Sequence, residues 1–129
     1  MDKQSPVAGP VRVLSILLVE DHEDTLRVIA RLLKRLGYAV TTARGVGEAR
    51  DLVSRERFDL LVSDIGLPDG SGLDIMREIR DRQGVRGIAL SGFGQEADIA
   101  RSREAGFADH LIKPVNFEVL KTRIAAIAV

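Results

Sequence analysis

The sequence of 129 residues contains no cysteine. It therefore has no disulfide and no thiolate ligand for a metal ion, which is compatible with a reducing compartment. No apolar run approaches the roughly 20 residues that cross a bilayer, and the start of the chain lacks the basic-then-apolar order of a signal peptide. We therefore expect a cytoplasmic protein that makes no direct contact with a membrane.

The chain also lacks net charge, because 19 lysines and arginines balance 19 aspartates and glutamates. Without a basic excess, charge alone does not favour binding to nucleic acid. Hydrophobic residues make up 45% of the sequence, which is typical of a globular protein and not of a disordered one. The length suits one domain with its own core, so we expect a single compact domain that does not bind nucleic acid.

Residues 1–12 have no helical or strand period and include Pro6, Gly9 and Pro10. Such a composition predicts a flexible tail or linker. From residue 13 onward, short apolar runs alternate with segments whose apolar residues recur at helical spacing. We expect the domain to cover residues 13–129.

Five strands and five helices are expected in alternation. Because parallel neighbours need helical crossovers, the alternation predicts an α/β fold, a doubly wound five-stranded parallel sheet with helices on both faces. Alternation alone leaves the order of the strands open. The expected strands lie at 13–19, 38–43, 60–64, 87–90 and 107–112, and the expected helices lie at 24–36, 45–57, 71–84, 95–105 and from 116 onward.

Capping residues mark several helix ends. Asp24 or Thr25 is expected to cap the first helix, Gly37 to end it, and Ser71 to cap the third helix. The fourth helix, at 95–105, has a thin apolar face made mostly of alanines. Thin packing predicts a helix of low local stability that can shift position.

Carboxylates follow two of the expected strands. Glu20 and Asp21 come directly after the first strand, and Asp64 ends the third. In open α/β sheets the ligand crevice lies at the carboxyl ends of the strands. Three converging carboxylates repel one another unless a cation neutralises them, and a donor set of oxygens favours a hard cation such as Mg²⁺. Magnesium beside a carboxylate suggests phosphoryl transfer, with Asp64 as the nucleophile.

Two polar residues are expected at the same edge of the sheet. Ser91 ends the fourth strand and supplies a hydroxyl, while Lys113 ends the fifth and supplies a compact positive charge. The backbone amides of Ile65 and Gly92 could donate to a phosphoryl oxygen, since glycine allows close approach.

Together these residues resemble the receiver domain of two-component response regulators, over about residues 13–127. The resemblance rests on Glu20-Asp21, on Ser-Asp-Ile-Gly-Leu-Pro-Asp-Gly-Ser-Gly at 63–72, on Ser91-Gly92 and on Lys113-Pro114. It implies a flavodoxin-like sheet with strand order 2-1-3-4-5. It also implies a phosphoacceptor that takes its phosphoryl group from a sensor histidine kinase or a histidine phosphotransfer domain.

The resemblance assigns roles to individual residues. Asp64 would accept the phosphoryl group, Asp21 and Asp64 would bind Mg²⁺ directly, and Glu20 would bind it mostly through water. The carbonyl of Gly66 would be a further ligand. Lys113 would pair with the phosphoryl group.

The remaining implied roles concern the switch and the loop after the fifth strand. Ser91 would turn towards the phosphate on activation, and the peptide bond before Pro114 would be cis. The family usually has an aromatic residue three positions before the lysine, where this chain has His110. We hypothesise that His110 couples to Ser91 by turning inward in its neutral form. We assign no role to His22, which is expected to be a solvated loop residue.

The segments 91–99 and 102–115 look most like receivers fused to hybrid sensor kinases. The chain is therefore either a single-domain regulator or a piece of a larger protein, and its proline-containing start slightly favours the second. The main alternative function is a pseudo-receiver, an interaction module with this fold but without phosphorylation. A flavin-binding flavodoxin and a dehalogenase-type phosphatase are disfavoured, because the acidic pair would repel a flavin phosphate and because the phosphatase needs an Asp-x-Asp motif.

Overall fold

The computed structural model describes residues 13–92 and 96–128, with the side chains of Glu96 and Ala97 outside the description. The predicted tail at 1–12 and the expected start of the fourth helix at Gln95 lie outside the described residues. The description therefore begins just before the first strand.

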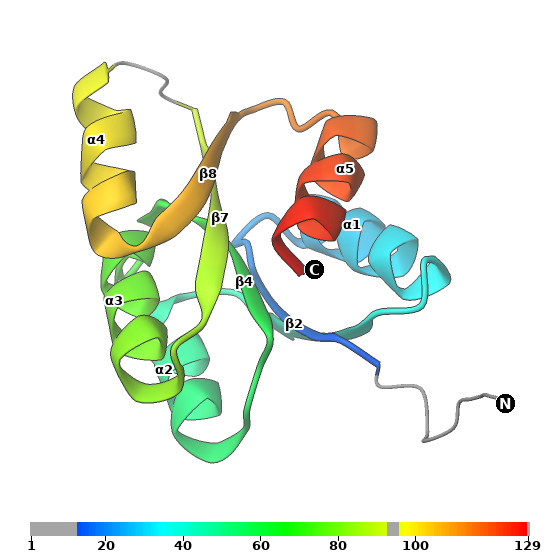
Figure 1. Ribbon diagram of the computed structural model, residues 1–129, viewed down its shortest axis with the longest axis horizontal. Coiled ribbons are helices and arrows are strands. Elements are labelled where there is room, and N and C mark those ends of the chain that lie inside the picture. Colours follow the sequence, from blue (N-terminus) through cyan, green and yellow to red (C-terminus); the bar gives the residue numbers. More distant parts are fainter. Residues whose placement is uncertain (1–12, 93–95, 129) are drawn as a thin grey trace, which may run out of the picture.

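Five parallel strands form the central sheet (Figure 1), in the order β3-β2-β4-β7-β8. Numbered by their place in the chain, these strands have the order 2-1-3-4-5, so the predicted doubly wound topology is confirmed. The strands are β2 (Ser15–Val19), β3 (Ala39–Ala43), β4 (Leu60–Asp64), β7 (Arg86–Ser91) and β8 (Phe107–Ile112).

Helices cover both faces of the sheet (Figure 1). One face packs against α1 (Glu23–Arg35) and α5 (Phe117–Ala128), and the other against α2 (Val46–Arg55), α3 (Gly72–Gln83) and α4 (Glu96–Ala105). None of the helices in the described ranges is long and apolar enough to cross a membrane.

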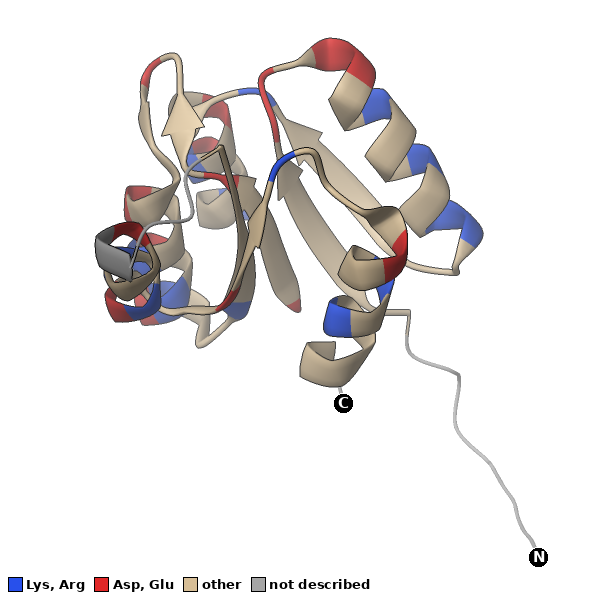
Figure 2. Cartoon of the chain, turned by 90° about the horizontal axis from the view of Figure 1, so that it is seen from above, with Lys and Arg blue, Asp and Glu red and all other residues tan. Residues whose placement is uncertain are grey.

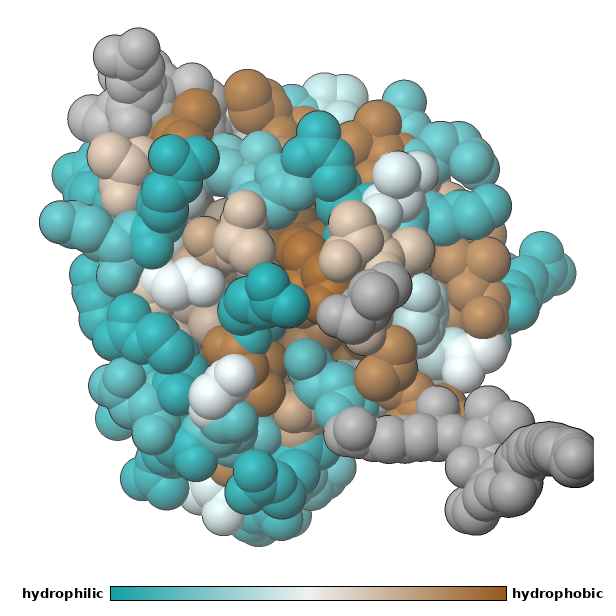
Figure 3. Space-filling model, viewed as in Figure 1, coloured by the Kyte–Doolittle hydropathy of each residue, from teal (hydrophilic) through white to brown (hydrophobic). Residues whose placement is uncertain are grey.

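The central strands are apolar on both sides because both sides are buried. In β2, Leu17 and Val19 enter the core beneath α2 and α3, whereas Ile16 and Leu18 enter the core beneath α1 and α5. Figure 3 shows that apolar side chains also gather near the middle of one outer face, among hydrophilic ones. Buried layers on both sides hold the carboxyl ends of the strands in fixed register.

The first strand and the first helix begin at other residues than predicted. The strand begins at Ser15, and Val13 is 55% exposed. The N-cap of α1 is His22, not Asp24 or Thr25, since the carbonyl of His22 already accepts from the amide of Leu26 at 2.9 Å. The predicted caps therefore lie inside the helix.

The charges of α1 follow its dipole (Figure 2), with acids in the first turn and bases in the last. Gly37, at φ 99°, follows the helix as predicted. The helix was expected to reach Leu36 but ends at Arg35, and Leu36, its C-cap, is 41% exposed.

A two-stranded hairpin was missed by the sequence analysis. It consists of β5 (Gly66–Leu67) and β6 (Gly70–Ser71), which pair across the turn at Pro68-Asp69. Ser71 caps α3 as predicted, accepting from the amide of Leu73 at 3.1 Å.

Asp69, at the tip of this hairpin, caps a different helix. Its carboxylate accepts from the amides of Val46 and Gly47, at 2.7 and 3.0 Å. These hydrogen bonds lower the pKa of Asp69, because they favour its ionised form. The hairpin is thereby fastened to the start of α2, just beyond Asp64.

The fourth helix is held mainly by small side chains. Ala105 is buried in the core and Ala100 is exposed. Ser102 is a buried polar residue on the same helix, 2% exposed. The predicted thin apolar face of this helix thus contains a serine that needs a hydrogen-bonding partner.

Candidate functional site

The carboxyl ends of the strands meet at one edge of the sheet. Glu20 and Asp21 directly follow β2, and Asp64 ends the neighbouring strand β4. Ser91 ends β7, and Lys113 comes directly after β8. Parallel pairing in register brings these five residues to the same end, as the sequence predicted.

Lys113 joins two of the carboxylates. Its Nζ donates to Oε1 of Glu20 at 2.8 Å and to Oδ2 of Asp64 at 2.7 Å. Partial burial lowers the pKa of Lys113, but the hydrogen bonds to Asp64 and Glu20 outweigh it and raise the pKa above its ordinary value. Lys113 is therefore a fixed positive charge at the edge of the sheet.

The two buried carboxyls respond to this environment in opposite directions. Burial raises the pKa of Glu20, but hydrogen bonds from Lys113 and from the amide of His22 outweigh it and lower the pKa to about 2. The pKa of Asp64 is raised to about 6. Burial is the largest cause, the negative charge of Glu20 also raises it, and Lys113 acts in the opposite direction. Glu20 is thus ionised at neutral pH, and Asp64 becomes ionised above about pH 6.

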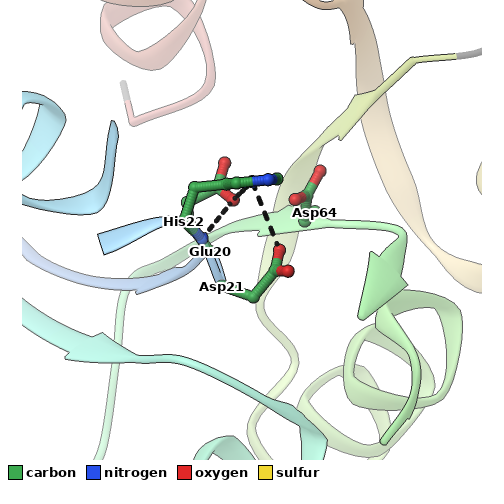
Figure 4. A group of neighbouring side chains, drawn as sticks. All are labelled: Glu20, Asp21, His22 and Asp64. Atoms are coloured by element: carbon green, nitrogen blue, oxygen red, sulfur yellow. Dashed lines mark hydrogen bonds and ion pairs between the residues drawn. The ribbon is translucent and has the colours of Figure 1, made fainter. Parts of the chain in front are cut away.

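A divalent cation fits this arrangement. Glu20, Asp21, His22 and Asp64 each offer a ligand atom, and these atoms all lie within 4.8 Å of one another (Figure 4). Three carboxylates face the single ammonium group of Lys113, so the site has negative charge left to neutralise. Glu20 is fully buried and Asp64 is 4% exposed, which makes that charge costly without a counterion.

The loop after Asp64 is packed closely against that residue. A Cβ on Gly72 would collide with the carbonyl oxygen of Asp64, whereas a Cβ on Gly66 would meet nothing within 4 Å. The hydroxyl of Ser63 also donates to the carbonyl of Asp64, at 2.8 Å. The backbone of Asp64 is therefore positioned by the start of α3 and by the hydroxyl of Ser63 in its own strand.

The predicted backbone donors have different surroundings. The amide of Ile65 donates to the carbonyl of Leu90 at 3.0 Å, so a bond to a phosphoryl oxygen would require this hydrogen bond to break. Gly92 is exposed, and within the described residues other than its chain neighbours no atom lies within 4 Å of a Cβ built on it. Ser91 is buried, and its carbonyl accepts from the amide of Lys113 at 2.8 Å.

The peptide bond between Lys113 and Pro114 is cis. The loop that follows borders a groove of about 580 Å³ between α1 and the start of α5. Val28, Ile29, Leu32, Val115 and Phe117 line it, with His22 and Lys113 among the remaining lining residues. The groove is largely apolar and adjoins the charged edge of the sheet.

His110 lies on β8 beside α4. Its Nδ1 is 3.0 Å from Oγ of Ser102, and the same hydroxyl donates to the carbonyl of Ile99 at 2.9 Å. Since a hydroxyl has one proton, the histidine ring is the donor to Ser102. The structure thus gives the buried Ser102 a partner on the neighbouring strand.

Three residues of the site were missed by the sequence analysis. His22 was given no role, yet its ring lies in the carboxylate cluster, and its position next to the acidic pair was the available signal. Gly72 and Asp69 act through contacts with Asp64 and with α2. Those contacts depend on the hairpin, which has only two residues in each strand.

Known proteins resemble the chain over most of its length. The family model described as response regulator receiver domain matches residues 16–125. The response regulator protein PilR of Pseudomonas aeruginosa is 36% identical over 110 residues, which are 84% of this chain and 25% of PilR. The polar-differentiation response regulator DivK of Brucella anthropi is 32% identical over 105 residues, which are 79% of this chain and 85% of DivK.

A sensor protein also contains a matching segment. EvgS of Escherichia coli is 30% identical over 123 residues, which are 95% of this chain and 10% of EvgS. The chain thus spans a small part of some relatives and most of others.

Solved structures share the fold. A CheY-like receiver domain protein from Methanospirillum hungatei has a TM-score of 0.85 at 29% identity, over 91% of this chain and 94% of that one. A response regulator from Burkholderia pseudomallei, solved with a phosphorylated aspartic acid and a calcium ion, has a TM-score of 0.79 at 31% identity, over 88% and 66%. TrrA from Thermotoga maritima, solved with Mg²⁺ and BeF, has a TM-score of 0.78 at 27% identity, over 89% and 99%.

Proposed function

Because the chain belongs to the response regulator receiver domain family, we propose that Asp64 accepts a phosphoryl group from a phosphohistidine donor. The observation that carries this proposal is the double contact of Lys113 with Asp64 and Glu20, at 2.7 and 2.8 Å. The contact holds a cation beside a buried carboxylate at the edge where parallel sheets bind ligands. Phosphoryl transfer depends mainly on such positioning and on charge neutralisation.

The reaction requires Asp64 in its ionised form. An oxygen of the carboxylate attacks phosphorus, the bond between phosphorus and the donor's imidazole nitrogen breaks, and its electron pair stays on that nitrogen. Burial raises the pKa of Asp64 to about 6, which is still below neutral pH. The ionised carboxylate is therefore available at pH 7. Lys113 then turns from the carboxylate oxygen to the phosphoryl oxygens.

The proposed cation is Mg²⁺, bound directly by Asp21, Asp64 and the carbonyl of Gly66 and mostly through water by Glu20. When bound, Mg²⁺ would neutralise charge on the phosphoryl oxygens. The ions named for the receivers from Burkholderia and Thermotoga support a divalent cation. Glu20 suits an indirect role, because both its oxygens already accept hydrogen bonds, from Lys113 and from His22.

After transfer, the proposed switch runs through Ser91, with the amide of Gly92 donating to the phosphate. Ser91 is buried at the end of β7 and pairs with Ile112 of β8, two positions beyond the pair of Ala89 and His110. A turn of Ser91 towards the phosphate would leave space at the sheet edge. We infer that His110 fills this space, which would shift α4 through Ser102.

The proposed donor is a sensor histidine kinase or a histidine phosphotransfer domain. A phosphohistidine must reach Asp64 past Lys113, and the largely apolar groove beside Lys113 offers a surface for the protein that presents it. Such a donor implies a cytoplasmic location. The match inside the sensor protein EvgS supports a receiver that belongs to a larger hybrid kinase.

The test is incubation with Mg²⁺ and a small phosphodonor such as acetyl phosphate, followed by intact-mass measurement. The wild type should gain the mass of one phosphoryl group, and Asp64→Asn should gain none. Asp74→Asn is the matched control, because Asp74 is exposed on α3 and pairs with Arg77. It should be labelled like the wild type. A wild type that stays unlabelled would favour the pseudo-receiver instead.

A further inference from the structure

His22 lies within the carboxylate cluster although the proposed Mg²⁺ site has no use for it. Its Nδ1 is 3.1 Å from Oε2 of Glu20 and 3.7 Å from Oδ1 of Asp21. Figure 4 shows the ring nitrogen turned towards both carboxylates, with Asp64 beside them. The ring therefore occupies the same small volume as the acidic ligands.

These spacings suit two ligand atoms of one ion. Atoms bound at right angles, each about 2.1 Å from a cation, lie about 3 Å apart. The nitrogen of His22 and the nearer oxygen of Glu20 already have this spacing. A transition ion bound by this nitrogen would have Oε2 of Glu20 as a direct ligand, whereas Mg²⁺ would meet Glu20 mostly through water. The ion would replace the hydrogen bond from the ring, and Oε2 would keep the hydrogen bond from the backbone amide of His22, at 3.0 Å.

The ring of His22 contributes little to the structure of α1. The side chain is 73% exposed, and although His22 is the N-cap of α1, its side chain makes no capping hydrogen bond within the described part of the chain. The backbone of His22 supplies what the helix uses. Replacing the ring should therefore leave α1 intact.

Resting on the cation site of the proposed function, we propose that His22 is a nitrogen ligand of that site and makes it prefer first-row transition ions such as Co²⁺ and Zn²⁺ over Mg²⁺. Imidazole is a good ligand for these ions, whereas Mg²⁺ is bound by oxygens and water. The other ligands of the site are oxygens and serve both kinds of ion. His22 thus determines the metal preference.

The chain contains its own control for this proposal. It has no cysteine and two histidines, so His110 is the other imidazole able to bind these ions. His110 lies on β8, and its Nδ1 contacts Ser102 of α4. His22→Phe and His110→Phe are the same chemical change inside and outside the cluster.

The experiment is calorimetric titration of the purified chain with Co²⁺ and, separately, with Mg²⁺. His22→Phe should lower the affinity for Co²⁺ by about tenfold or more and leave that for Mg²⁺ within about twofold. His110→Phe should change neither. In the proton NMR spectrum of the Co²⁺ form, a strongly shifted imidazole N–H signal should appear in the wild type and in His110→Phe and be absent from His22→Phe.

Two results would overturn the proposal. Equal losses of Co²⁺ and Mg²⁺ affinity in His22→Phe would mean that the ring only positions Glu20, and unchanged affinities would mean that it has no part in binding. Either result is compatible with phosphorylation of Asp64 in Mg²⁺, so the proposed function would stand. A wild type that binds neither ion would instead contradict the cation site itself.

Discussion

Lys113 lies between two carboxyls with opposite pKa shifts. The pKa of Glu20 is lowered to about 2, so its stabilisation of the fold is fully present above its ordinary pKa of 4.5 and is lost as the pH falls from there through about 2. Asp64 has a raised pKa, so its contribution to stability is present below its ordinary pKa of 3.8 and is lost as the pH rises through about 6. The folded chain therefore holds its proposed nucleophile in an unfavourable ionised form at neutral pH.

A neutral amide at position 64 should consequently stabilise the metal-free chain. Asp64→Asn should raise the free energy of unfolding at pH 8 relative to the wild type, and the gain should be smaller at pH 4.5 by about 2 kcal/mol. The measurement is urea denaturation followed by circular dichroism, with a chelator present. An equal effect of the substitution at both pH values would show that Asp64 is not held at a raised pKa.

Among the secondary-structure elements, the hairpin β5–β6 follows Asp64 directly, and the helix α4 packs against β8 and α3. The hairpin is fastened to α2 by Asp69, and Gly72, the first residue of α3 directly after the hairpin, closely approaches the backbone of Asp64. Helix α4 is joined to β8 by a hydrogen bond between Ser102 and His110. It is joined to α3 by Arg80, which donates to the carbonyls of Glu104 and Ala105 at 3.2 and 3.0 Å. The close approach of Gly72 positions the backbone of Asp64, and the contact between Ser102 and His110 joins α4 to the sheet.

Gly72 gives a direct test of the close approach. Gly72→Ala should lower the free energy of unfolding by about 2 kcal/mol or more, because its Cβ would meet backbone atoms that cannot move independently. Gly66→Ala, in the hairpin that precedes α3, places its Cβ more than 4 Å from the described residues other than its chain neighbours and should cost far less. Thermal or urea unfolding of both variants gives the comparison. Similar losses in the two would contradict the packing described behind Asp64.

The link between α4 and β8 gives a prediction for the switch. If His110 turns inward in its neutral form, a beryllofluoride mimic of the phosphoryl group should shift the amide NMR signals of α4, β8 and α5 less completely at pH 5.5 than at pH 8. The reason is that burying a charged imidazole costs free energy. The other charged residues on or facing this surface are Asp109, Arg103 and Arg123.

His110→Phe should remove this dependence on pH, while Ser102→Ala should keep it. The mimic must be fully bound at both pH values for the comparison to hold. Wild-type shifts that are the same at both pH values, or a His110→Phe variant that depends on pH as the wild type does, would exclude His110 as the coupling residue.

For the whole molecule, the edge of the sheet could be predicted from the sequence because parallel strands end together. The apolar runs before Glu20 and Asp64 fixed where those carboxylates meet, and the strand order followed from the resemblance. The capping of α2 by Asp69 could not be predicted, because Asp69 and Val46 are 23 positions apart in the chain. The hairpin that brings them together has only two residues in each strand. The position of the His22 ring could not be predicted either, because an exposed side chain at the start of a helix can adopt several rotamers.

If Asp64 carries the phosphoryl group, as proposed, the modified residue can be located in the phosphorylated chain. After incubation with Mg²⁺ and acetyl phosphate, borohydride reduction converts an acyl phosphate on aspartate to homoserine, which tandem mass spectrometry of the peptides can assign. We expect homoserine at position 64 in the wild type and none in Lys113→Ala or Asp64→Asn at the same exposure time. Homoserine at Asp21 or at Asp69, or its absence from position 64, would contradict the proposal.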